Sequence, residues 1–538
     1  MRAIPTECDV IVLGLGPTGL FASTYLARLG HRVIAIEKHS SLFGLPRAGH
    51  VDHEIVRFLQ ELGVEQPFLE DAFPVSSYRW YNAEGDVLLE MDWGGQSASG
   101  YNSDYMMYQP VLENAVVSAM DKASDRISVQ RNLYVTDVGQ DDDGVTVSAR
   151  RCSWHEGDRM VLEEGGVEVR GSFLIAADGA RSNVREKLAI PRFDRGFNET
   201  WLDVDVKVLR PLPAMDPHQV CDPRRPIFIS PLGKRHHRFE WAIRPGEDFA
   251  DFRDPAKAWE LLSTQGVGVG DVEIVRQQVY TFEARVAERW REGRVFLAGD
   301  AAHTMPPFMG QGACSGIRDS VNLAWKLDLV LKGIAPLSLL DSYQTERQPH
   351  VETWTDLSIR TGEVSCTLDV DEAARRDAML LGGEAPPMPN FPDLTAGVLD
   401  HGHAGDIDDP VGQTFPQRDV TLDGKSGPFD DVAARGFFLA GFGLDPTAHL
   451  DGDARAILEQ LNAPAFAVSA EAKPGVVVDN DGFYAAWAAD HNLVAAIVRP
   501  DYYVFGIARD ASAISGLVRR LGEGMMLLSP TCREASNG

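Results

Sequence analysis

CDVIVLGLGPTG, at residues 8–19, decides the fold of this chain. A β-branched run leads into glycines at positions 14, 16 and 19, a GxGxxG spacing that joins a strand to a helix. Residues 20–29 read as an apolar helix that closes on Gly30, which is free to adopt a left-handed C-terminal conformation. Residues 31–37 read as a second strand with an acid at its end. Together these parts predict a βαβ unit.

The three glycines have different tasks in such a unit. Gly14 turns the chain tightly, Gly16 lets the backbone approach a pyrophosphate, and Gly19 lets the helix pack closely on the strand. The helix N-terminus offers unpaired N–H groups and a positive dipole to phosphates. Glu37 stands near the usual place of the carboxylate that binds a ribose diol. We therefore predict a dinucleotide site; the alternative is a purely structural turn.

Two later segments place carboxylates at the carboxyl ends of strands, where open α/β sheets bind ligands. FLIAADGARS, at 173–182, ends its strand in Asp178-Gly179, and RVFLAGDAAH, at 294–303, ends in Gly299-Asp300. A glycine-rich loop, TMPPFMGQGACSG at 304–316, then enters a helix predicted over 317–333. Such a loop can direct backbone N–H groups at negative charge.

The motifs and their order resemble the single-component flavoprotein aromatic hydroxylases, the para-hydroxybenzoate hydroxylase-like group. The stretch from VYTFEARV to the helix at 317–333 is most similar to the branch of 3-(3-hydroxyphenyl)propionate and phenol hydroxylases. The resemblance runs from about Cys8 to Gln348, and more weakly to the end, and implies an α/β fold. Its parts would be a Rossmann-like FAD-binding domain in two segments, 1–190 and 277–390, an inserted β-sheet substrate domain, 191–276, and a thioredoxin-like C-terminal domain, 410–538.

The resemblance also implies which residues hold FAD. Gly14, Gly16, Gly19 and Glu37 would bind the ADP half, Asp300 the ribityl hydroxyls, and Pro307, Gly310, Gln311 and Gly312 the isoalloxazine edge. Arg47 and Gln109 match positions that contact the diphosphate or ribityl chain, and Asp178 a position tied to both FAD and nicotinamide use. Alternatives remain: Asp300 as a helix N-cap, and Asp178 and Arg47 in packing or surface pairing. No second GxGxxG unit is visible, so NADH or NADPH is expected to dock transiently.

A substrate chamber is expected under a second sheet. Residues 201–208, 226–230, 236–243 and 274–282 have the alternation and the β-branched or aromatic content of strands. We expect the face that carries His237 to point inward, so that His237 or Arg235 meets a substrate carboxylate, with Tyr280 a further candidate. The alternative is a solvated basic strand end at 234–238.

Hydroxylation of a phenol needs a group that draws the phenolic proton. Asp52 matches a carboxylate considered an active-site base in phenol hydroxylase-like proteins, and an extended strand would place His50 on the same side. We predict that Asp52, alone or through His50, is this base. The alternative for Asp52 is an N-cap of a helix at 53–63, and lone histidines such as His50 are commonly structural.

Composition excludes several other classes. The 538 residues carry a formal charge of −28, which disfavours nucleic acid as a partner. No apolar run is long enough for a membrane span, and no signal peptide is visible at the N-terminus. The six cysteines form no CxxC and no metal-ligand cluster, so we expect a reduced, cytoplasmic protein without a metal. Residues 390–409 read as a linker.

The predicted function is hydroxylation of a phenol through a flavin C4a-hydroperoxide, with NAD(P)H and O2. The expected substrates resemble 3-(3-hydroxyphenyl)propionate. The alternatives are a hydroxylase of a polycyclic aromatic natural product and a non-catalytic FAD-binding partner protein. A homodimer is one assembly that the sequence permits.

Overall fold

The computed structural model describes residues 5–155, 159–212, 216–384, 391–400 and 409–527. These residues divide into two compact units: Met1–Gly95, Asn102–Ser320 and Thr353–Phe391 form the first, and Gln96–Tyr101, Val321–Glu352 and Pro392–Gly538 the second. This division differs from the four segments expected above, since residues 321–352 group with the C-terminal part. Among the described helices, none combines the length and the apolar composition needed to cross a membrane.

A nine-stranded sheet in the first unit carries the dinucleotide motif. β1 (Glu7–Leu13) pairs in parallel with β2 (Val33–Glu37) and β12 (Val167–Ala176), and β12 pairs in parallel with β19 (Val295–Leu297). Buried β-branched and aliphatic residues fill these strands, as expected for a sheet covered on both faces. α1 (Pro17–Arg28) follows β1, which confirms the predicted βαβ unit. The carboxyl ends of β1, β12 and β19 therefore meet at one edge. The other strands are β8 (Ile127–Arg131), β9 (Leu133–Gln140), β10 (Val145–His155), β11 (Arg159–Leu162) and β18 (Arg291–Glu292).

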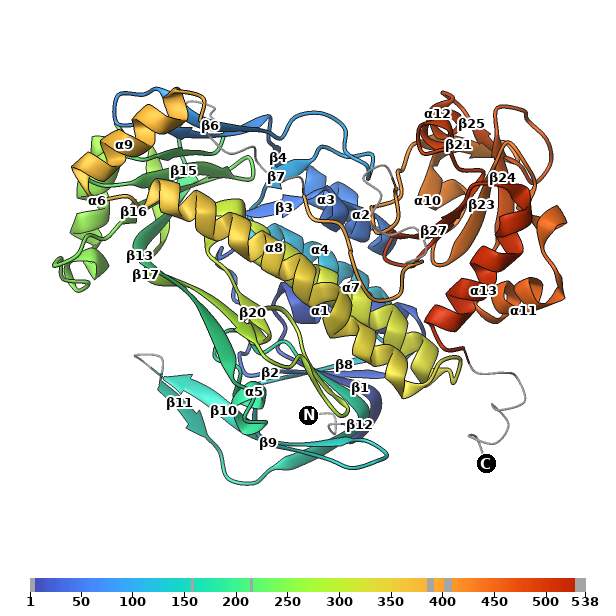
Figure 1. Ribbon diagram of the computed structural model, residues 1–538. Coiled ribbons are helices and arrows are strands. Elements are labelled where there is room, and N and C mark those ends of the chain that lie inside the picture. The colour runs from blue at the N-terminus through green and yellow to red at the C-terminus, as the bar shows by residue number, and fades with distance from the viewer. Residues whose placement is uncertain (1–4, 156–158, 213–215, 385–390, 401–408, 528–538) are drawn as a thin grey trace. The chain divides into compact units, whose positions relative to one another are not determined.

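A second, eight-stranded sheet contains all four strands predicted between residues 201 and 282. Its longest pair, β13 (Arg192–Val208) and β17 (Val272–Ala287), runs antiparallel side by side (Figure 1). The sheet order is β20-β17-β13-β16-β15-β14-β5-β6. Its remaining strands are β5 (Ser77–Tyr81), β6 (Val87–Asp92), β14 (His218–Val220), β15 (Ile227–Leu232), β16 (His236–Ala242) and β20 (His303–Thr304). The sheet thus recruits strands from outside 191–276, and β17 crosses the boundary expected at 276.

The first unit also contains a three-stranded sheet and several helices. β3 (His50–Asp52) pairs with β7 (Asp104–Met106), which also pairs with β4 (Phe73–Pro74). The helices are α2 (His53–Leu62), α3 (Glu65–Leu69), α4 (Gln109–Lys122), α5 (Asn183–Lys187), α6 (Pro255–Thr264) and α9 (Val370–Leu381). The long helices α7 (Gln311–Leu331) and α8 (Ser342–Ser365) begin or end in this unit and contribute residues to the other.

The C-terminal sheet has thioredoxin-like topology. β23 (Phe438–Phe442) is parallel to β24 (Ala465–Ser469) and antiparallel to β26 (Ala495–Val498), which pairs with β27 (Val504–Ala508). α11 (Gly452–Gln460) joins β23 to β24, α12 (Phe483–Asp490) precedes β26, and α13 (Ile514–Gly524) follows β27. Three strands and a short helix complete the unit: β21 (Asp419–Leu422), β22 (Lys425–Pro428), β25 (Val477–Asp479) and α10 (Phe429–Val432).

Strand alternation gives this C-terminal sheet two apolar faces. Leu439 and Ile497 pack with α11 and α13, whereas their neighbours Phe438 and Val498 pack with α12. Residues 390 and 401–408 of the expected linker lie outside the described residues, as does Cys532. The other five cysteines are free thiols, namely Cys8, Cys152, Cys221, Cys314 and Cys366.

Candidate active site

One cavity of about 500 Å³ in the first unit joins the edge of the nine-stranded sheet to the second sheet. Ten of the predicted cofactor residues line it: Gly14, Gly16, Glu37, Arg47, Gln109, Asp178, Asp300, Pro307, Gly310 and Gly312. Gly19 and Gln311 do not line it. The predicted cofactor motifs, which are far apart in the chain, therefore meet in one place.

The turn after β1 has the shape of a phosphate cradle. Gly14 has φ +91°, and a Cβ there would lie 2.3 Å from the carbonyl oxygen of Ala177. A Cβ on Gly19 would lie 1.9 Å from the Gly14 carbonyl, so Gly19 serves close helix packing. At Gly16 nothing lies within 4 Å of a Cβ, and this glycine faces the cavity. A side chain at Gly16 would fill space that the N-terminus of α1 offers to a phosphate.

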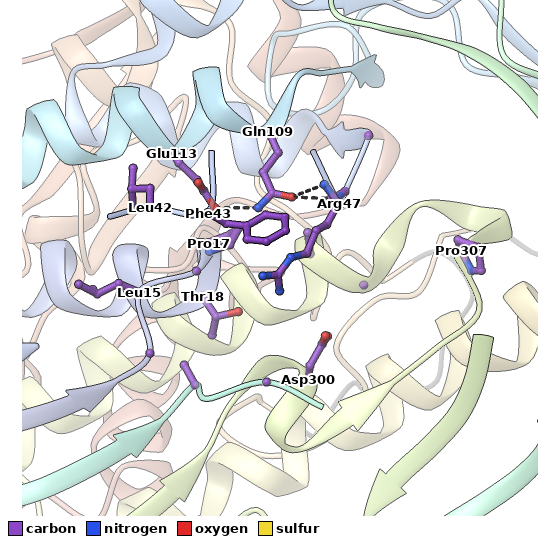
Figure 2. Close-up of a pocket in the computed structure, with 18 of the residues that line it drawn as sticks. Leu15, Pro17, Thr18, Leu42, Phe43, Arg47, Gln109, Glu113, Asp300 and Pro307 are labelled. Carbon is purple, nitrogen blue, oxygen red and sulfur yellow. Dashed lines mark hydrogen bonds between the residues drawn. The ribbon is translucent and has the colours of Figure 1, made fainter. Parts of the chain in front are cut away.

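Side chains on the opposite wall order the loop before β3. The Gln109 Oε1 accepts hydrogen bonds from the backbone N–H groups of Arg47 and Ala48, at 3.0 and 2.9 Å, while its Nε2 donates to Glu113 at 2.7 Å (Figure 2). The Arg47 guanidinium lies 4.1 Å from the centroid of the Phe43 ring. Gln109 thus fixes the backbone from which Arg47 extends into the cavity.

Three carboxylates line this half of the cavity. Glu37 accepts hydrogen bonds from the backbone N–H groups of Leu15 (2.8 Å) and His39 (3.0 Å), so it also braces the turn after β1. Asp300 faces the cavity on the side opposite Arg47 (Figure 2), and burial among protein atoms raises its pKa. Its side chain caps no helix, since the 3-10 turn Gly299–Ala301 has Ala298 at its N-cap. Burial also raises the pKa of Asp178, which accepts from the Val184 N–H.

The loop before α7 supplies the third wall of the cavity. Pro307, Gly310 and Gly312 line it, and Gly310 has φ +66°. Gln311 instead turns into the protein, where its Nε2 donates to Asp52 and its Oε1 accepts from Arg318, both at 3.0 Å. The residues present therefore fit a dinucleotide such as FAD: an open glycine cradle for the diphosphate, a cavity-facing carboxylate for hydroxyls, and a loop with exposed backbone for a ring edge.

Asp52 does not line the cavity. Its side chain accepts from the N–H groups of Glu54 and Ile55 and so caps α2. Its Oδ2 is 2.5 Å from an Arg318 nitrogen. Burial alone would raise its pKa, but the charge of Arg318, with further groups, holds the pKa below the usual range. This placement favours the alternative of an ion-paired helix cap for Asp52, and its role as the base stays a prediction.

His50 lines the cavity and has a different carboxylate partner. Its Nε2 lies 2.9 Å from Asp104 Oδ1 and its Nδ1 3.3 Å from the Gly310 carbonyl oxygen. Burial alone would lower the pKa of His50, but the hydrogen bond with Asp104 raises it. Burial raises the pKa of Asp104. Sequence analysis missed Asp104, because only the pairing of β3 with β7 brings it beside His50.

An aromatic wall continues from His50 toward the second sheet. The Trp93 ring lies 5.2 Å from His50 and 5.0 Å from Tyr78, and Tyr78 lies 6.1 Å from Phe228. The Tyr78 hydroxyl accepts a hydrogen bond of 2.8 Å from Gln219 Nε2. All of these residues line the cavity. Sequence analysis missed this wall because its members come from four separate segments with no common motif.

The second sheet presents the opposite face of β16 to the cavity from the one expected. Arg238 and Glu240 line the cavity. Their neighbours Phe239 and Trp241 pack with residues of α6, so the apolar face belongs to the core of the sheet. His237 lies on this second face, and burial lowers its pKa to about 4.

The other two predicted substrate contacts also lie outside the cavity lining. Arg235 is 80% exposed and lies 3.8 Å from Asp71, and the Tyr280 ring stacks 4.9 Å from the guanidinium of Arg276. For His237 the difference has a physical cause: the alternation of β16 was recognised, but its apolar face was assigned to the ligand rather than to the helix that covers it.

Comparison with known proteins agrees with the geometry of the cavity. Residues 7–358 match the FAD binding domain family, and residues 412–523 match the HcaD C-terminal domain family. The chain is 36% identical over 521 residues to a probable NADH-specific resorcinol 4-hydroxylase of Rhodococcus jostii (strain RHA1), covering 95% of this chain and 94% of that protein. It is 33% identical to the 3-(3-hydroxy-phenyl)propionate/3-hydroxycinnamic acid hydroxylase of Klebsiella pneumoniae (strain 342), covering 94% and 93%.

Solved structures share the whole architecture. Aklavinone-11 hydroxylase, in a ternary complex with FAD and aklavinone, is 25% identical and superposes with a TM-score of 0.76 over 96% of this chain and 99% of that one. The flavin-dependent monooxygenase PieE, in complex with FAD and substrate, is 22% identical with a TM-score of 0.78 over 97% of this chain and 100% of that one. At 22% identity the second likeness speaks for the fold alone.

Proposed function

This chain belongs to the FAD binding domain family of flavoprotein aromatic hydroxylases, and on that premise we propose that it hydroxylates a small phenol with NADH and O2. One observation supports the proposal above the others: a single cavity joins the glycine cradle to the aromatic wall, with His50 between them. A cofactor and an aromatic ring held in this cavity would be in direct reach of each other. A non-catalytic FAD-binding protein would have no need of the second compartment.

Bound FAD would supply the transfer of electrons from NADH and the activation of O2. The chain's own residues would do the rest. Gly14, Gly16 and Arg47 would hold the diphosphate, Asp300 would accept hydrogen bonds from the ribityl hydroxyls, and Gly310 to Gly312 would border the flavin ring. Asp178 would serve both FAD and the transient docking of NADH.

We assign the removal of the phenolic proton to His50. Asp104 accepts a hydrogen bond from Nε2–H, and the Gly310 carbonyl can only accept one from Nδ1–H. Nδ1 would receive the phenolic proton in the neutral ring, after Nδ1 has left this carbonyl. A substrate hydroxyl would replace the 3.3 Å contact of Nδ1 with the Gly310 carbonyl. Asp104 stabilises the resulting imidazolium, in keeping with the raised pKa of His50. Deprotonation makes the ring electron-rich, which favours its hydroxylation.

The names of the two relatives suggest two kinds of phenol as substrate, resorcinol and 3-(3-hydroxy-phenyl)propionate. A polycyclic aromatic compound is the alternative that the aklavinone-bound structure suggests. The FAD-loaded protein should be assayed with members of all three classes, measuring NADH and NADPH oxidation alongside product formation. Oxidation without a hydroxylated product from any of them would overturn the proposal, and faster turnover with NADPH would correct the choice of NADH.

A cytoplasmic location and a homodimer are the finer parts of this proposal. The free thiols of the five described cysteines support a reducing compartment. Sedimentation of the purified protein tests the dimer, and cell fractionation tests the location.

A further inference from the structure

Two polar groups, Gln219 and Glu240, lie at the far end of the aromatic wall. Gln219 is 2% exposed; its Nε2 donates to Tyr78, but its Oε1 is buried and unpartnered. Glu240 also lines the cavity, and the nearest charged group, an Arg238 nitrogen, is 3.6 Å from its carboxylate. Buried polar groups in native proteins are nearly always hydrogen-bonded, so the unpartnered Gln219 Oε1 points to a ligand, and Glu240 borders the same space.

Arg238 is not free to bind a ligand anion. Its Nε and one terminal nitrogen donate to the two carboxylate oxygens of Asp205 at 2.7 and 3.0 Å, and the other donates to the Arg47 carbonyl at 2.7 Å. Asp203 lies 3.2 Å away on the neighbouring strand. Arg276 contacts the same two aspartates, at 2.9 and 3.5 Å. Both guanidiniums are therefore committed to the sheet.

The cluster of these five residues contains one more carboxyl than it has cations. Asp203, Asp205 and Glu240 face Arg238 and Arg276, and all five are at least 92% buried. Burial raises the pKa of Glu240 to about 7 and also raises the pKa of Asp203, in both cases against the attraction of Arg238. Once the pH is high enough for Glu240 to ionise, a further anion placed beside it would meet a negative charge that the two arginines do not balance.

The remaining cations of the cavity belong to its cofactor half. Lys38 and Arg181 follow the carboxyl ends of β2 and β12, and Arg47 acts on Asp300. Within the described lining, the end formed by Tyr78, Gln219 and Glu240 thus has hydrogen-bond acceptors but no available cation. This is the reverse of what a carboxylate-bearing substrate requires.

We propose that Gln219 and Glu240 form a subsite for a second, uncharged hydroxyl of the substrate and exclude a carboxylate from that position. The inference rests on the proposed function and specifies its substrate class as small neutral dihydroxybenzenes. One hydroxyl lies toward His50, the ring lies along Trp93 and Tyr78, and the second hydroxyl donates to Gln219 Oε1 or to the Glu240 carboxylate. Phenylpropionates, which end in a carboxylate, are poor ligands.

Calorimetric titration of the FAD-loaded protein tests this assignment without relying on turnover. The probes are resorcinol and 3-(3-hydroxyphenyl)propionate, titrated into wild type and Glu240→Gln near pH 8, where Glu240 is ionised. Because a buried carboxylate repels a second carboxylate, the wild type should favour resorcinol by about tenfold or more. Glu240→Gln should shift the ratio of the two affinities toward the acid by about tenfold. Gln219→Leu should weaken resorcinol binding without improving that of the acid.

Glu273→Gln is the matched control, since it removes an exposed carboxylate from β17 of the same sheet. It should leave the ratio unchanged. Tighter binding of the acid than of resorcinol by wild type, or an unaltered ratio in Glu240→Gln, overturns the subsite. If one of these two results is found and the protein still hydroxylates the phenolic acid efficiently, the subsite is wrong but the proposed function stands. Absence of hydroxylation with every phenol, despite FAD binding, defeats the proposed function itself.

Discussion

The cofactor half of the cavity is built around a glycine turn of the backbone, whereas the proposed substrate half is made of side chains from separate strands. Around the turn after β1, function depends on where a Cβ is absent, as at Gly14 and Gly16. At the other end it depends on carboxyls, an amide and aromatic rings carried by separate strands. Backbone requirements leave a local signature in the sequence, and side-chain assemblies do not. The two halves should therefore fail in different ways when they are changed.

Gly14→Val should abolish the cofactor half. The left-handed φ of +91° and the approach of a Cβ to within 2.3 Å of Ala177 leave no room for a branched side chain. We expect purified protein with less than about a tenth of the wild-type flavin absorbance. Gly139→Val is the control, since a Cβ there has no neighbour within 4 Å and its φ is ordinary. Full flavin content in Gly14→Val would contradict the cradle.

His50→Gln should leave flavin binding intact and impair hydroxylation. Loss of a general base typically costs about 10² to 10⁴ in rate. NADH consumption should then exceed product formation, as measured by chromatography of the phenol and its product. Asp104→Asn should give part of the same effect, because it removes the acceptor that fixes the tautomer of His50. A wild-type ratio of product to NADH in His50→Gln would move the base elsewhere.

Asp52→Asn provides the contrast for His50. Because Asp52 caps α2 and pairs with Arg318 away from the cavity, we expect hydroxylation per bound FAD within about threefold of wild type and a lower melting temperature. Its lowered pKa means that the wild-type carboxylate stabilises the fold above the unfolded pKa, and that this stabilisation is lost as the pH falls below about 4. The difference in melting temperature between wild type and Asp52→Asn should therefore become smaller at acidic pH. A hydroxylation defect as large as that of His50→Gln would restore Asp52 as the base.

Asp300→Ala should weaken FAD binding by a smaller factor than Gly14→Val. Leaving ribityl hydroxyls without their acceptor costs about 1 to 3 kcal/mol, or roughly 5 to 150-fold in affinity. Fluorescence titration of the apoprotein with FAD measures the change. An unaltered dissociation constant would assign the ribityl chain to other groups of the cavity.

The same contrast explains how much of the site was readable from the sequence. GxGxxG, the DG pair and the GDAAH segment each lie within a dozen residues, so their spacing alone predicted the sheet edge where β1, β12 and β19 end. Glu240 was passed over because it alternates with Phe239 and Trp241, and the apolar residues were taken for the ligand face. Both faces of β16 are buried, and the packing of α6 decides which of them is left to face the ligand. The sequence of β16 alone does not show where α6 packs.

The sequence did not indicate that Asp104 and Gln219 belong to the site, for a related reason. Asp104 acts only through its pairing opposite β3, and Gln219 only through a parallel pairing of β14 with β5. Both pairings are long-range, and neither segment carries a recognisable spacing. The charge balance that distinguishes a neutral from an acidic substrate is thus a property of the assembled sheet.

The smallest predicted effect concerns the stability cost of the substrate half. Glu240 has a pKa raised to about 7 in the fold, above its usual value of 4.5. Folding therefore favours its protonated form, and the fold loses stability as the pH rises from about 4.5 to about 7. Glu240→Gln removes this loss and leaves two aspartates facing two arginines. Between pH 5 and pH 8, the free energy of unfolding of the variant should rise by about 1 to 2 kcal/mol relative to that of wild type. This is less than the full pKa shift implies, because Asp203 shares the proton.

Thermal melts at those two pH values measure this gain, with Glu273→Gln as the reference for an exposed carboxylate of the same sheet. Glu273→Gln should show the same pH dependence as wild type, because the Glu273 side chain is exposed to solvent and lies outside the buried cluster. A gain confined to Glu240→Gln means that the uncompensated charge is maintained at a cost in stability, as expected where a side chain is kept for its ligand. Parallel melting curves for wild type and Glu240→Gln would show instead that the carboxyl is solvated through the cavity, and its capacity to repel an anionic substrate would then be small.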